Sequence, residues 1–197
     1  MSDASGYWAG RYARGDTPWD KAMAAPPLTE AIPRGFFTGR ILVPGSGPGH
    51  DARALAALPG VSVLGLDIVP QAVESARAAH AGAGLPLEFV HGDFFDLPAT
   101  LAGAFDTLVE HTCLCAIDPG MRPRYPASAA LALRPGGVFF GIFFLNPDTD
   151  AGPPFAISRE EIAALFSPHF ERISEWAPSS CFAGRENREH VMVWRRR

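Results

Sequence analysis

The chain has 197 residues, of which 47% are hydrophobic, so we expect a packed single domain over residues 1–197 rather than a disordered chain. Its formal net charge of −4 provides no general attraction to nucleic acid or to an anionic membrane, and we expect neither as a partner. No apolar run reaches the roughly 20 residues of a membrane span, the first residues lack a signal peptide's apolar core, and the three cysteines match neither a disulfide framework nor a zinc pattern, so we expect a cytoplasmic protein without a metal site.

The first 35 residues are rich in aromatic side chains, and Thr17 followed by Pro18 has the pattern of a helix N-cap and first helical position. Apolar runs predict seven strands, within residues 39–47, 61–68, 86–93, 104–117, 138–145, 170–177 and 189–196. Helical patterns occupy residues 50–58, 69–84, 120–133 and 158–168. In the last of these, Ser158 with Glu161 three residues later has the form of a capping box.

Strands and helices alternate along most of the chain. This order favours a doubly wound α/β fold, in which crossover helices cover both faces of a mostly parallel sheet. The near-continuous apolar strands agree with burial on both faces. The last two strands have no helix between them, and an antiparallel pairing is favoured there.

The stretch 42–51, LVPGSGPGHD, has the pattern of a ligand-binding loop. Gly45, Gly47 and Gly49 follow a strand and precede a helix, where missing Cβ atoms let a ligand approach the backbone. About twenty residues later, Asp67 and Ile68 close the next strand, and a carboxylate at that place accepts hydrogen bonds from ribose hydroxyls. The combination predicts a site for an adenosine-type cofactor.

The third strand ends at Asp93 and Phe94, which have the chemistry to meet an adenine amino group and ring face. A dinucleotide prefers the spacing G-x-G-x-x-G, whereas the third glycine here comes one residue early. A nicotinamide-dependent oxidoreductase is therefore disfavoured. The alternative for Phe94 is simple core packing.

Taken together, these motifs resemble class I S-adenosylmethionine (SAM)-dependent methyltransferases with a Rossmann-like sheet. More narrowly, the segments YWAGRYARGDTPWD, ILVPGSGPGHD, CAIDPGMRPRY and GPPF are similar to the thiopurine S-methyltransferase family, especially its thiol and halide methyltransferase branch. Most class I enzymes carry an acid at the position of Val43, and the family resembled replaces it with VPG, as here. The resemblance implies a seven-stranded sheet whose last strand is antiparallel.

The resemblance also implies a cofactor, SAM, with its methionine end over the three glycines, its ribose at Asp67 and its adenine at Asp93 and Phe94. Trp8 and Trp19 match positions where the family's N-terminal segment covers the methionine part, and residues 1–35 are accordingly expected to form an aromatic lid. A tryptophan beside a sulfonium also contributes cation–π attraction and excludes water. Alternatively, these rings only dock the segment on the core.

Glu110 and His111 end the fourth strand, at the edge where sites form in such sheets. Histidine suits proton transfer near neutral pH, so we expect His111 either to take the proton of a thiol acceptor or to stabilise its thiolate. Glu110 is expected to orient His111 or to bind the cofactor's ammonium group. The family varies at the position of His111, and an ordinary strand-end histidine is the alternative.

The preferred function is methyl transfer to a small soft nucleophile, most simply a thiol and alternatively a halide, by a monomer. Two other functions stay open, an O- or N-methyltransferase of small molecules and a SAM-binding protein without catalysis. Weaker candidates are Arg122 and Arg124 as contacts of an anionic substrate, against a solvated helix start, and Phe155 as a pocket wall. Cys113 and Cys115 are expected to be small buried hydrophobes. His91 and His169 are expected to be ordinary surface or strand-end residues.

Overall fold

The structure, a computed structural model, describes residues 4–147 and 151–197. The described chain forms a seven-stranded sheet in the order β3-β2-β1-β4-β5-β7-β6. Its strands are β1 (Gly39–Pro44), β2 (Val61–Asp67), β3 (Leu87–His91), β4 (Phe105–His111), β5 (Leu133–Phe144), β6 (Phe170–Trp176) and β7 (Glu189–Arg196). β7 pairs antiparallel with both β5 and β6, and β1 to β5 pair in parallel. The expected doubly wound, mostly parallel fold with an antiparallel last strand is confirmed.

The α-helices of the described residues are α1 (Ala4–Ala13), α2 (Pro26–Ala31), α3 (His50–Ala56), α4 (Pro70–His80), α5 (Arg124–Ala132) and α6 (Arg159–Phe166). Short 3₁₀ turns lie at Ile32–Arg34, Ala99–Leu101, Leu114–Ala116 and Pro119–Met121. α6 begins after Ser158 as predicted, because the Ser158 hydroxyl accepts a hydrogen bond from the Glu161 N–H at 3.0 Å.

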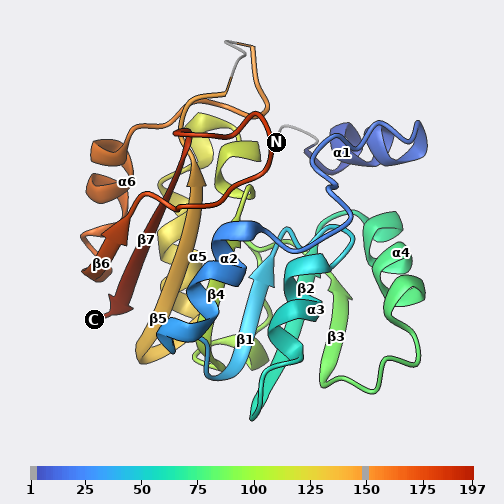
Figure 1. Cartoon of the computed structure of the whole chain (residues 1–197), viewed down its shortest axis with the longest axis horizontal. Helices are drawn as coiled ribbons and strands as arrows, with labels where there is room; N and C mark the ends of the chain where they lie inside the picture. The colour runs from blue at the N-terminus through green and yellow to red at the C-terminus, as the bar shows by residue number, and fades with distance from the viewer. Residues whose placement is uncertain (1–3, 148–150) are drawn as a thin grey trace.

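Two apolar layers sandwich the sheet (Figure 1). Ile41 and Val43 of β1 point to the layer that holds α2, α3 and α4, and Leu42 between them points to the layer of α5 and α6. All three side chains are buried, because neighbouring residues of a strand face opposite sides and both sides are covered. The continuous apolar strands of the sequence have this origin.

The parallel strands point their carboxyl ends toward the end of the molecule where α1 lies (Figure 1). The glycine loop follows β1 there, Asp67 is the last residue of β2, and His111 is the last residue of β4. Because parallel strands share one direction, residues far apart in sequence meet at this edge.

Three local features differ from the sequence-based expectations. No helix begins at Pro18, since Thr17 and Asp20 close a single turn through the Asp20 N–H. α2 was not anticipated, because Pro26 and Pro27 interrupt the apolar pattern although they suit a first helical turn. β5 begins at Leu133 rather than Val138, because Leu133 pairs with Phe105 ahead of an irregularity in the ladder.

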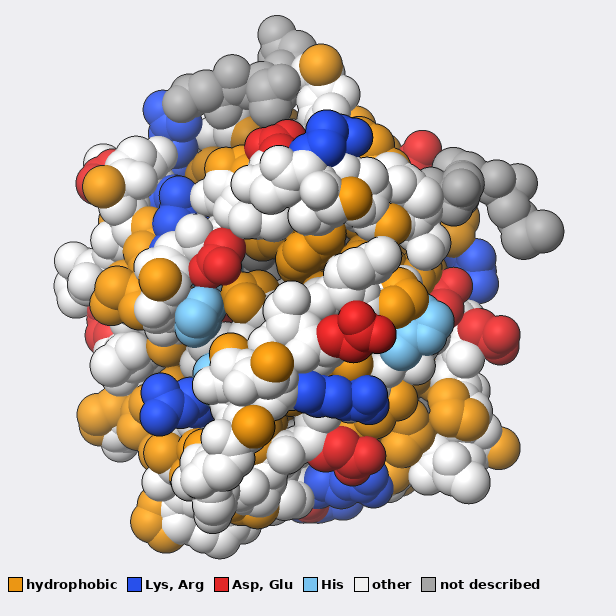
Figure 2. Space-filling view, turned by 90° about the vertical axis from the view of Figure 1, so that its right-hand side faces the viewer, with side chains coloured by type: hydrophobic (Ala, Val, Ile, Leu, Met, Phe, Trp, Pro, Cys, Tyr) orange, Lys and Arg blue, Asp and Glu red, His pale blue; other side chains and the backbone are white. Residues whose placement is uncertain are grey.

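The side of the molecule that carries α4 shows Lys and Arg side chains interspersed with Asp and Glu (Figure 2). Hydrophobic side chains lie between them, and no stripe of a single charge crosses this face. None of the described helices combines the length and the apolar character that a bilayer crossing requires.

Candidate active site

The glycine loop leaves β1 with three consecutive odd-numbered glycines at positive φ, +61° at Gly45, +51° at Gly47 and +84° at Gly49. Side chains are excluded by close neighbours as well as by conformation. A Cβ on Gly45 would lie 2.9 Å from the Cys113 Sγ, and one on Gly49 would lie 2.3 Å from the Phe89 ring. The loop therefore needs glycine at these positions.

Asp67 ties the end of β2 to this loop. Its Oδ2 accepts a hydrogen bond from the Gly47 N–H at 2.8 Å, and its Oδ1 accepts one from the Val69 N–H at 2.9 Å. Burial raises the pKa of the Asp67 carboxyl, although these two N–H groups act against the rise. Ile68 follows directly, and its carbonyl lies 3.2 Å from His91 Nε2. Asp67 thus lies beside the glycine loop, and ribose binding by its carboxylate stays a prediction.

Asp93 and Phe94 lie beyond β3 with different exposures. Asp93 is exposed, and its Oδ1 accepts a hydrogen bond from the Phe95 N–H at 2.8 Å. Phe94 is buried, and its ring centroid lies 4.9 Å from that of Tyr125. The structure therefore packs Phe94 into the core, and an adenine contact at these two residues stays a prediction.

The N-terminal segment (residues 1–35, described from residue 4) brings aromatic rings over the glycine loop. Trp8 and Trp19 pack edge to face with centroids 5.1 Å apart, and Trp19 packs on Tyr12 at 5.7 Å. The Tyr12 hydroxyl oxygen lies 3.3 Å from where a Cβ on Gly47 would be. Burial raises the pKa of Tyr12 to about 12, so the hydroxyl stays protonated.

Glu110 is buried and anchors the turn after β4. Its Oε1 accepts hydrogen bonds from the Cys113 and Leu114 N–H groups at 2.9 and 2.8 Å, and its Oε2 accepts a short hydrogen bond from the Tyr125 hydroxyl. Burial raises the pKa of Glu110 against these donors. The carboxylate is thus engaged by its own loop and α5 rather than by His111.

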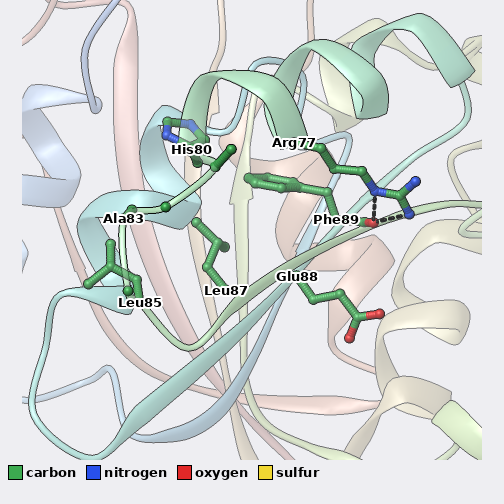
Figure 3. A pocket seen from close by; sticks show the side chains of 10 residues that line it. Arg77, His80, Ala83, Leu85, Leu87, Glu88 and Phe89 are labelled. Atoms are coloured by element: carbon green, nitrogen blue, oxygen red, sulfur yellow. Dashed lines mark hydrogen bonds between the residues drawn. The ribbon is translucent and has the colours of Figure 1, made fainter.

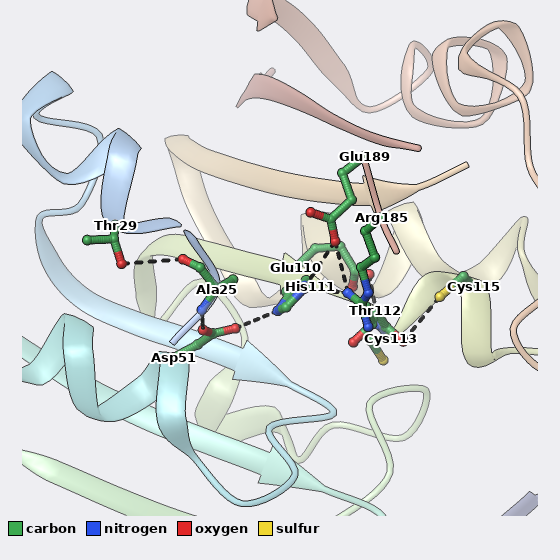
Figure 4. A network of polar contacts seen from close by, with 10 residues as sticks. All are labelled: Ala25, Thr29, Asp51, Glu110, His111, Thr112, Cys113, Cys115, Arg185 and Glu189. Carbon is green, nitrogen blue, oxygen red and sulfur yellow. Dashed lines mark hydrogen bonds and ion pairs between the residues drawn. The ribbon is translucent and has the colours of Figure 1, made fainter. Parts of the chain in front are cut away.

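His111 contacts α3, β7 and the turn between β6 and β7 (Figure 4). Its Nδ1 lies 2.7 Å from Asp51 Oδ2 on α3, and its Nε2 lies 3.2 Å from Arg185 Nη1 and 3.8 Å from Glu189 Oε1. Arg185 in turn donates to Glu189 Oε1 at 2.9 Å. These four residues, Asp51, His111, Arg185 and Glu189, are called the charge cluster below.

The charge cluster changes the proton affinity of its members. Burial alone would lower the pKa of His111, but the Asp51 and Glu189 carboxylates outweigh it and raise the pKa to about 9. Burial likewise opposes ionisation of Asp51 and Glu189, yet the facing cations hold the pKa of each carboxyl below its usual value. At neutral pH His111 is therefore a proton-bearing imidazolium rather than a free base.

A pocket of about 60 Å³ joins the glycine loop to His111. Of the residues predicted from sequence, its lining includes Trp19, Gly45, Gly47 and His111. Other predicted residues contact the lining without being part of it. Trp8 packs on Trp19, and Asp67 accepts a hydrogen bond from the Gly47 N–H. Glu110 holds the Cys113–Leu114 turn, which follows the lining residue Thr112. Sequence reasoning missed Asp51, Phe182 and Lys21, which also line it, and the HD dipeptide after the glycines was the signal for Asp51.

A larger pocket of about 420 Å³ lies at the junction of α4 and β3 (Figure 3). None of the predicted site residues lines it, and its Arg77 guanidinium donates to the Phe89 carbonyl at 2.9 and 2.6 Å. His80 and Glu88 also line it, but Arg77 is engaged and His80 Nε2 lies 3.1 Å from the Pro48 carbonyl. Because the glycine loop and His111 line only the smaller of these two pockets, that pocket is the better candidate for the active site.

The weaker candidates have structural explanations. Arg122 is buried, with hydrogen bonds to the Glu161 carboxylate at 2.9 Å and to the Ala156 carbonyl at 2.9 Å, so it is neither solvated nor open to a substrate. The Arg124 guanidinium lies over the Phe95 ring, with its Cζ 4.9 Å from the ring centroid. Phe155 is half-buried, and its N–H donates to the Cys115 carbonyl at 2.7 Å.

Cys113 and Cys115 are protonated thiols in this setting. Burial raises the pKa of Cys113 well above its usual value and that of Cys115 to about 12. Neither is an activated nucleophile.

Part of the predicted loop after β5, residues 148–150, lies outside the described residues. Within them, no three His, Cys, Asp or Glu side chains are grouped to hold a metal ion.

The residues present suit the cofactor that the resemblance implies. Gly45 and Gly47 line the pocket, Asp67 stands at the sheet edge, and the Ser46 hydroxyl is buried without a hydrogen-bond partner among the described residues. Gly45, Gly47, Gly49 and Asp67 are the residues that would hold it. The pocket of about 60 Å³ is smaller than the roughly 300 Å³ or more of sites for such ligands.

Comparisons with known proteins find similar sequences. The family model for thiopurine S-methyltransferase matches residues 3–197. A probable thiol methyltransferase 2 of Arabidopsis thaliana is 32% identical over 98% of this chain and 86% of its own length. Thiocyanate methyltransferase 1 of Brassica oleracea is also 32% identical, over 97% of this chain and 85% of its own length.

Two solved structures share the fold. One, from work on the conversion of a disulfide bond into a thioacetal group during echinomycin biosynthesis, has a TM-score of 0.80 at 21% identity and covers 98% of this chain and 92% of its own. The other is the Burkholderia thailandensis 1,6-didemethyltoxoflavin-N1-methyltransferase with bound S-adenosylhomocysteine, with a TM-score of 0.75 at 20% identity over 98% of this chain and 86% of its own.

Proposed function

Because the chain belongs to the thiopurine S-methyltransferase family and is a SAM-dependent methyltransferase, we propose that its acceptor is a small soft nucleophile that reacts as an anion, most simply a thiolate. The single observation that carries this proposal is the position of His111, which lines the same pocket as Gly45 and Gly47. Its positive charge, with Arg185 beside it, favours an anionic acceptor next to the cofactor loop.

SAM, when bound, supplies a methyl group on a positively charged sulfur. The chain's part is to position the acceptor and to exclude water from the reacting centre. Trp19 and Phe182 provide apolar walls of the pocket, and His111 provides a charge that lowers the pKa of a thiol placed beside it. Of the two roles expected for His111, stabilising the thiolate is favoured, because a group with a pKa of about 9 already carries its proton at pH 7.

The names of the relatives support the same chemistry. Those relatives are described as acting on thiols and thiocyanate, which are soft sulfur nucleophiles. A halide is also anionic and needs no base, so iodide is a second acceptor to test. Methylation of an oxygen or nitrogen is the competing proposal. It is retained because a protein with the same fold is described as an N-methyltransferase.

A panel of acceptors tests the proposal. Purified protein with SAM is offered hydrosulfide, a small alkyl thiol, a thiopurine, iodide, a catechol and a primary amine, and S-adenosylhomocysteine formation is measured. We expect turnover with the sulfur acceptors and iodide, and at least about 100-fold less with catechol and amine. Turnover confined to catechol or amine would reject a soft nucleophile and establish the O- or N-methyltransferase.

The panel needs a control for non-enzymatic methylation, since thiolates react slowly with SAM alone. Reactions with SAM and each acceptor but without protein measure this background. Asp106→Asn serves as the control variant, because Asp106 pairs with Arg134 and accepts the Arg40 N–H at the opposite edge of the sheet. We further propose that the protein acts as a cytoplasmic monomer of one domain.

A further inference from the structure

Asp51 connects three separate parts of the site (Figure 4). It lies in the first turn of α3, directly after the glycine loop. Its Oδ1 accepts a hydrogen bond from the Ala25 N–H at 2.7 Å, and its Oδ2 meets His111 Nδ1 at 2.7 Å. One carboxylate thereby holds both Ala25 of the N-terminal segment and the His111 ring, which lines the acceptor pocket.

The neighbouring residue makes a parallel connection. His50 Nε2 lies 3.0 Å from Asp20 Oδ1 in the N-terminal segment. His50 and Asp51, the HD dipeptide after the glycines, therefore both hold that segment in place over the loop. Only Asp51 continues to His111.

The charges facing His111 come from every element packed against it. α3 contributes Asp51 and, farther away, His50, and β7 contributes Glu189. The turn between β6 and β7 contributes Arg185, and Glu110 precedes His111 on β4. Lys21 and Asp20 line the same pocket from the N-terminal segment.

The charge cluster balances only when His111 is protonated. Asp51 and Glu189 are two carboxylates, and Arg185 alone leaves one negative charge without a partner in a buried place. Arg185 Nη1 lies 3.2 Å from His111 Nε2, a distance that also fits a neutral ring whose Nε2 accepts a hydrogen bond. Against a neutral ring stands Glu189 Oε1, which lies 2.9 Å from Arg185 Nη1 and 3.8 Å from His111 Nε2 and can therefore offset the charge of both.

We propose that Asp51 is a positioning residue of the transfer reaction, which keeps His111 an imidazolium at the acceptor pocket and links that charge to the closed position of the N-terminal segment. The inference rests on the proposed function, since it assigns the charge to acceptor binding. It adds that Asp51, in the first turn of α3, holds both the N-terminal segment over the glycine loop and His111 at the acceptor pocket.

Iodide is the acceptor that tests this idea, because it carries no proton between pH 6 and 10. The amino group of SAM titrates alike in every variant, so differences between the pH profiles of the variants report the titration of the protein. We expect kcat/KM for iodide to be level near neutral pH and to fall as His111 loses its proton at alkaline pH. In Asp51→Asn the amide keeps an oxygen for the Ala25 N–H but offers no charge, and the fall should move down by about 1–3 pH units.

His111→Arg provides the rescue, because an arginine stays charged without a carboxylate partner. With Arg at this position, kcat/KM for iodide should lack the alkaline fall caused by His111, and adding Asp51→Asn should no longer change the profile. His111→Gln should lower iodide methylation most at neutral pH, and its difference from the wild type should shrink as the pH rises through about 9. A profile of Asp51→Asn that coincides with that of the wild type would overturn the proposal, as would unchanged sensitivity to Asp51→Asn in the His111→Arg protein.

A readout without catalysis separates this inference from the proposed function. In the wild-type protein labelled with ¹⁵N-histidine, both ring nitrogens of His111 should have imidazolium shifts at pH 7.5, and the neutral form should appear at that pH in Asp51→Asn. A neutral ring in the wild type would overturn the inference even if thiols are methylated. Conversely, an Asp51-dependent imidazolium in a protein that methylates neither iodide nor thiols would reject the proposed acceptor alone.

The link to the N-terminal segment is tested by cofactor binding. Calorimetry should show weaker S-adenosylhomocysteine binding for Asp51→Ala, which removes both contacts, than for Asp51→Asn, which keeps the one to Ala25. Equal affinities for the two variants would contradict that part of the proposal. Asp106→Asn is the matched Asp-to-Asn control and should leave the iodide pH profile and cofactor affinity unchanged.

Discussion

Single backbone positions determine whether the glycine loop forms. Gly49 combines a φ of +84° with a Phe89 ring atom 2.3 Å from the position of a Cβ. Gly60 has a similar φ of +71° but nothing within 4 Å of its Cβ position. The pair therefore separates conformational strain from steric exclusion.

We expect Gly60→Ala to lower the free energy of unfolding by about 1 kcal/mol, the cost of a left-handed alanine. Gly49→Ala should cost about 2–4 kcal/mol, because a displaced aromatic ring adds to that strain. Urea unfolding of both variants measures the difference. Equal losses would mean that Phe89 yields without cost and that φ alone requires glycine.

Glu110 is a buried carboxylate whose hydrogen bonds hold the turn after β4. Tyr125→Phe removes the donor to its Oε2 and should lower the free energy of unfolding at pH 7 by about 1–3 kcal/mol. Tyr7→Phe is the matched control, since Tyr7 is 47% exposed, and it should change stability little. Similar stabilities of the two variants would show that Glu110 does not depend on Tyr125.

At the scale of elements, the N-terminal segment closes the site over the loop. Trp19 lines the pocket and packs between Trp8 and Tyr12. We expect Trp19→Ala to weaken S-adenosylhomocysteine binding about tenfold, through lost contact and cation–π attraction, with little change in unfolding midpoint. Calorimetry measures the affinity, with Tyr7→Ala as a control on the same segment. Unchanged affinity would mean that Trp19 only docks the segment.

The elements differ in how well the sequence predicted them. α4 and α6 have strong local signals, Pro70 in the first turn of one and Ser158 as the N-cap of the other. α2 has six residues and two prolines, too short for a periodic pattern, and its burial of Leu28 and Ala31 stabilises it. Packing against the sheet, which no local pattern contains, therefore decides the short elements.

At the scale of the whole molecule, the charge cluster makes stability depend on pH. The pKa of His111 is raised from 6.5 to about 9, so its stabilising contribution is complete below pH 6.5 and is lost as the pH rises through about 9. The shift corresponds to about 3 kcal/mol. Asp51 and Glu189 have lowered pKa values, so their contributions are lost on the acid side instead.

We therefore expect the free energy of unfolding of the wild type to fall between pH 6.5 and 9.5, and His111→Gln to show a much smaller fall. Chemical denaturation at five or six pH values in this range measures it. His169→Gln, which changes a half-buried histidine outside the charge cluster, is the control. A wild-type profile without the fall would contradict a protonated His111 in the native state.

Much of the protein was determined by its sequence alone. The alternating apolar runs specified the strands, and their order with the crossover helices specified a parallel sheet. The glycines and Asp67 follow β1 and end β2, so the sequence also predicted that they lie at one edge of the sheet, where parallel strands end together. These features depend on local patterns or on chain order, and both can be read from a single sequence.

Only the tertiary structure decided which side chains surround His111. Asp51 and Arg185 are 60 and 74 residues away from it, and Glu189 comes from a strand that runs in the opposite direction. Glu110, adjacent to His111 in sequence, is instead directed to Cys113, Leu114 and Tyr125. Adjacent residues of a strand face opposite sides of the sheet, so the partners of each side chain depend on strand order and register.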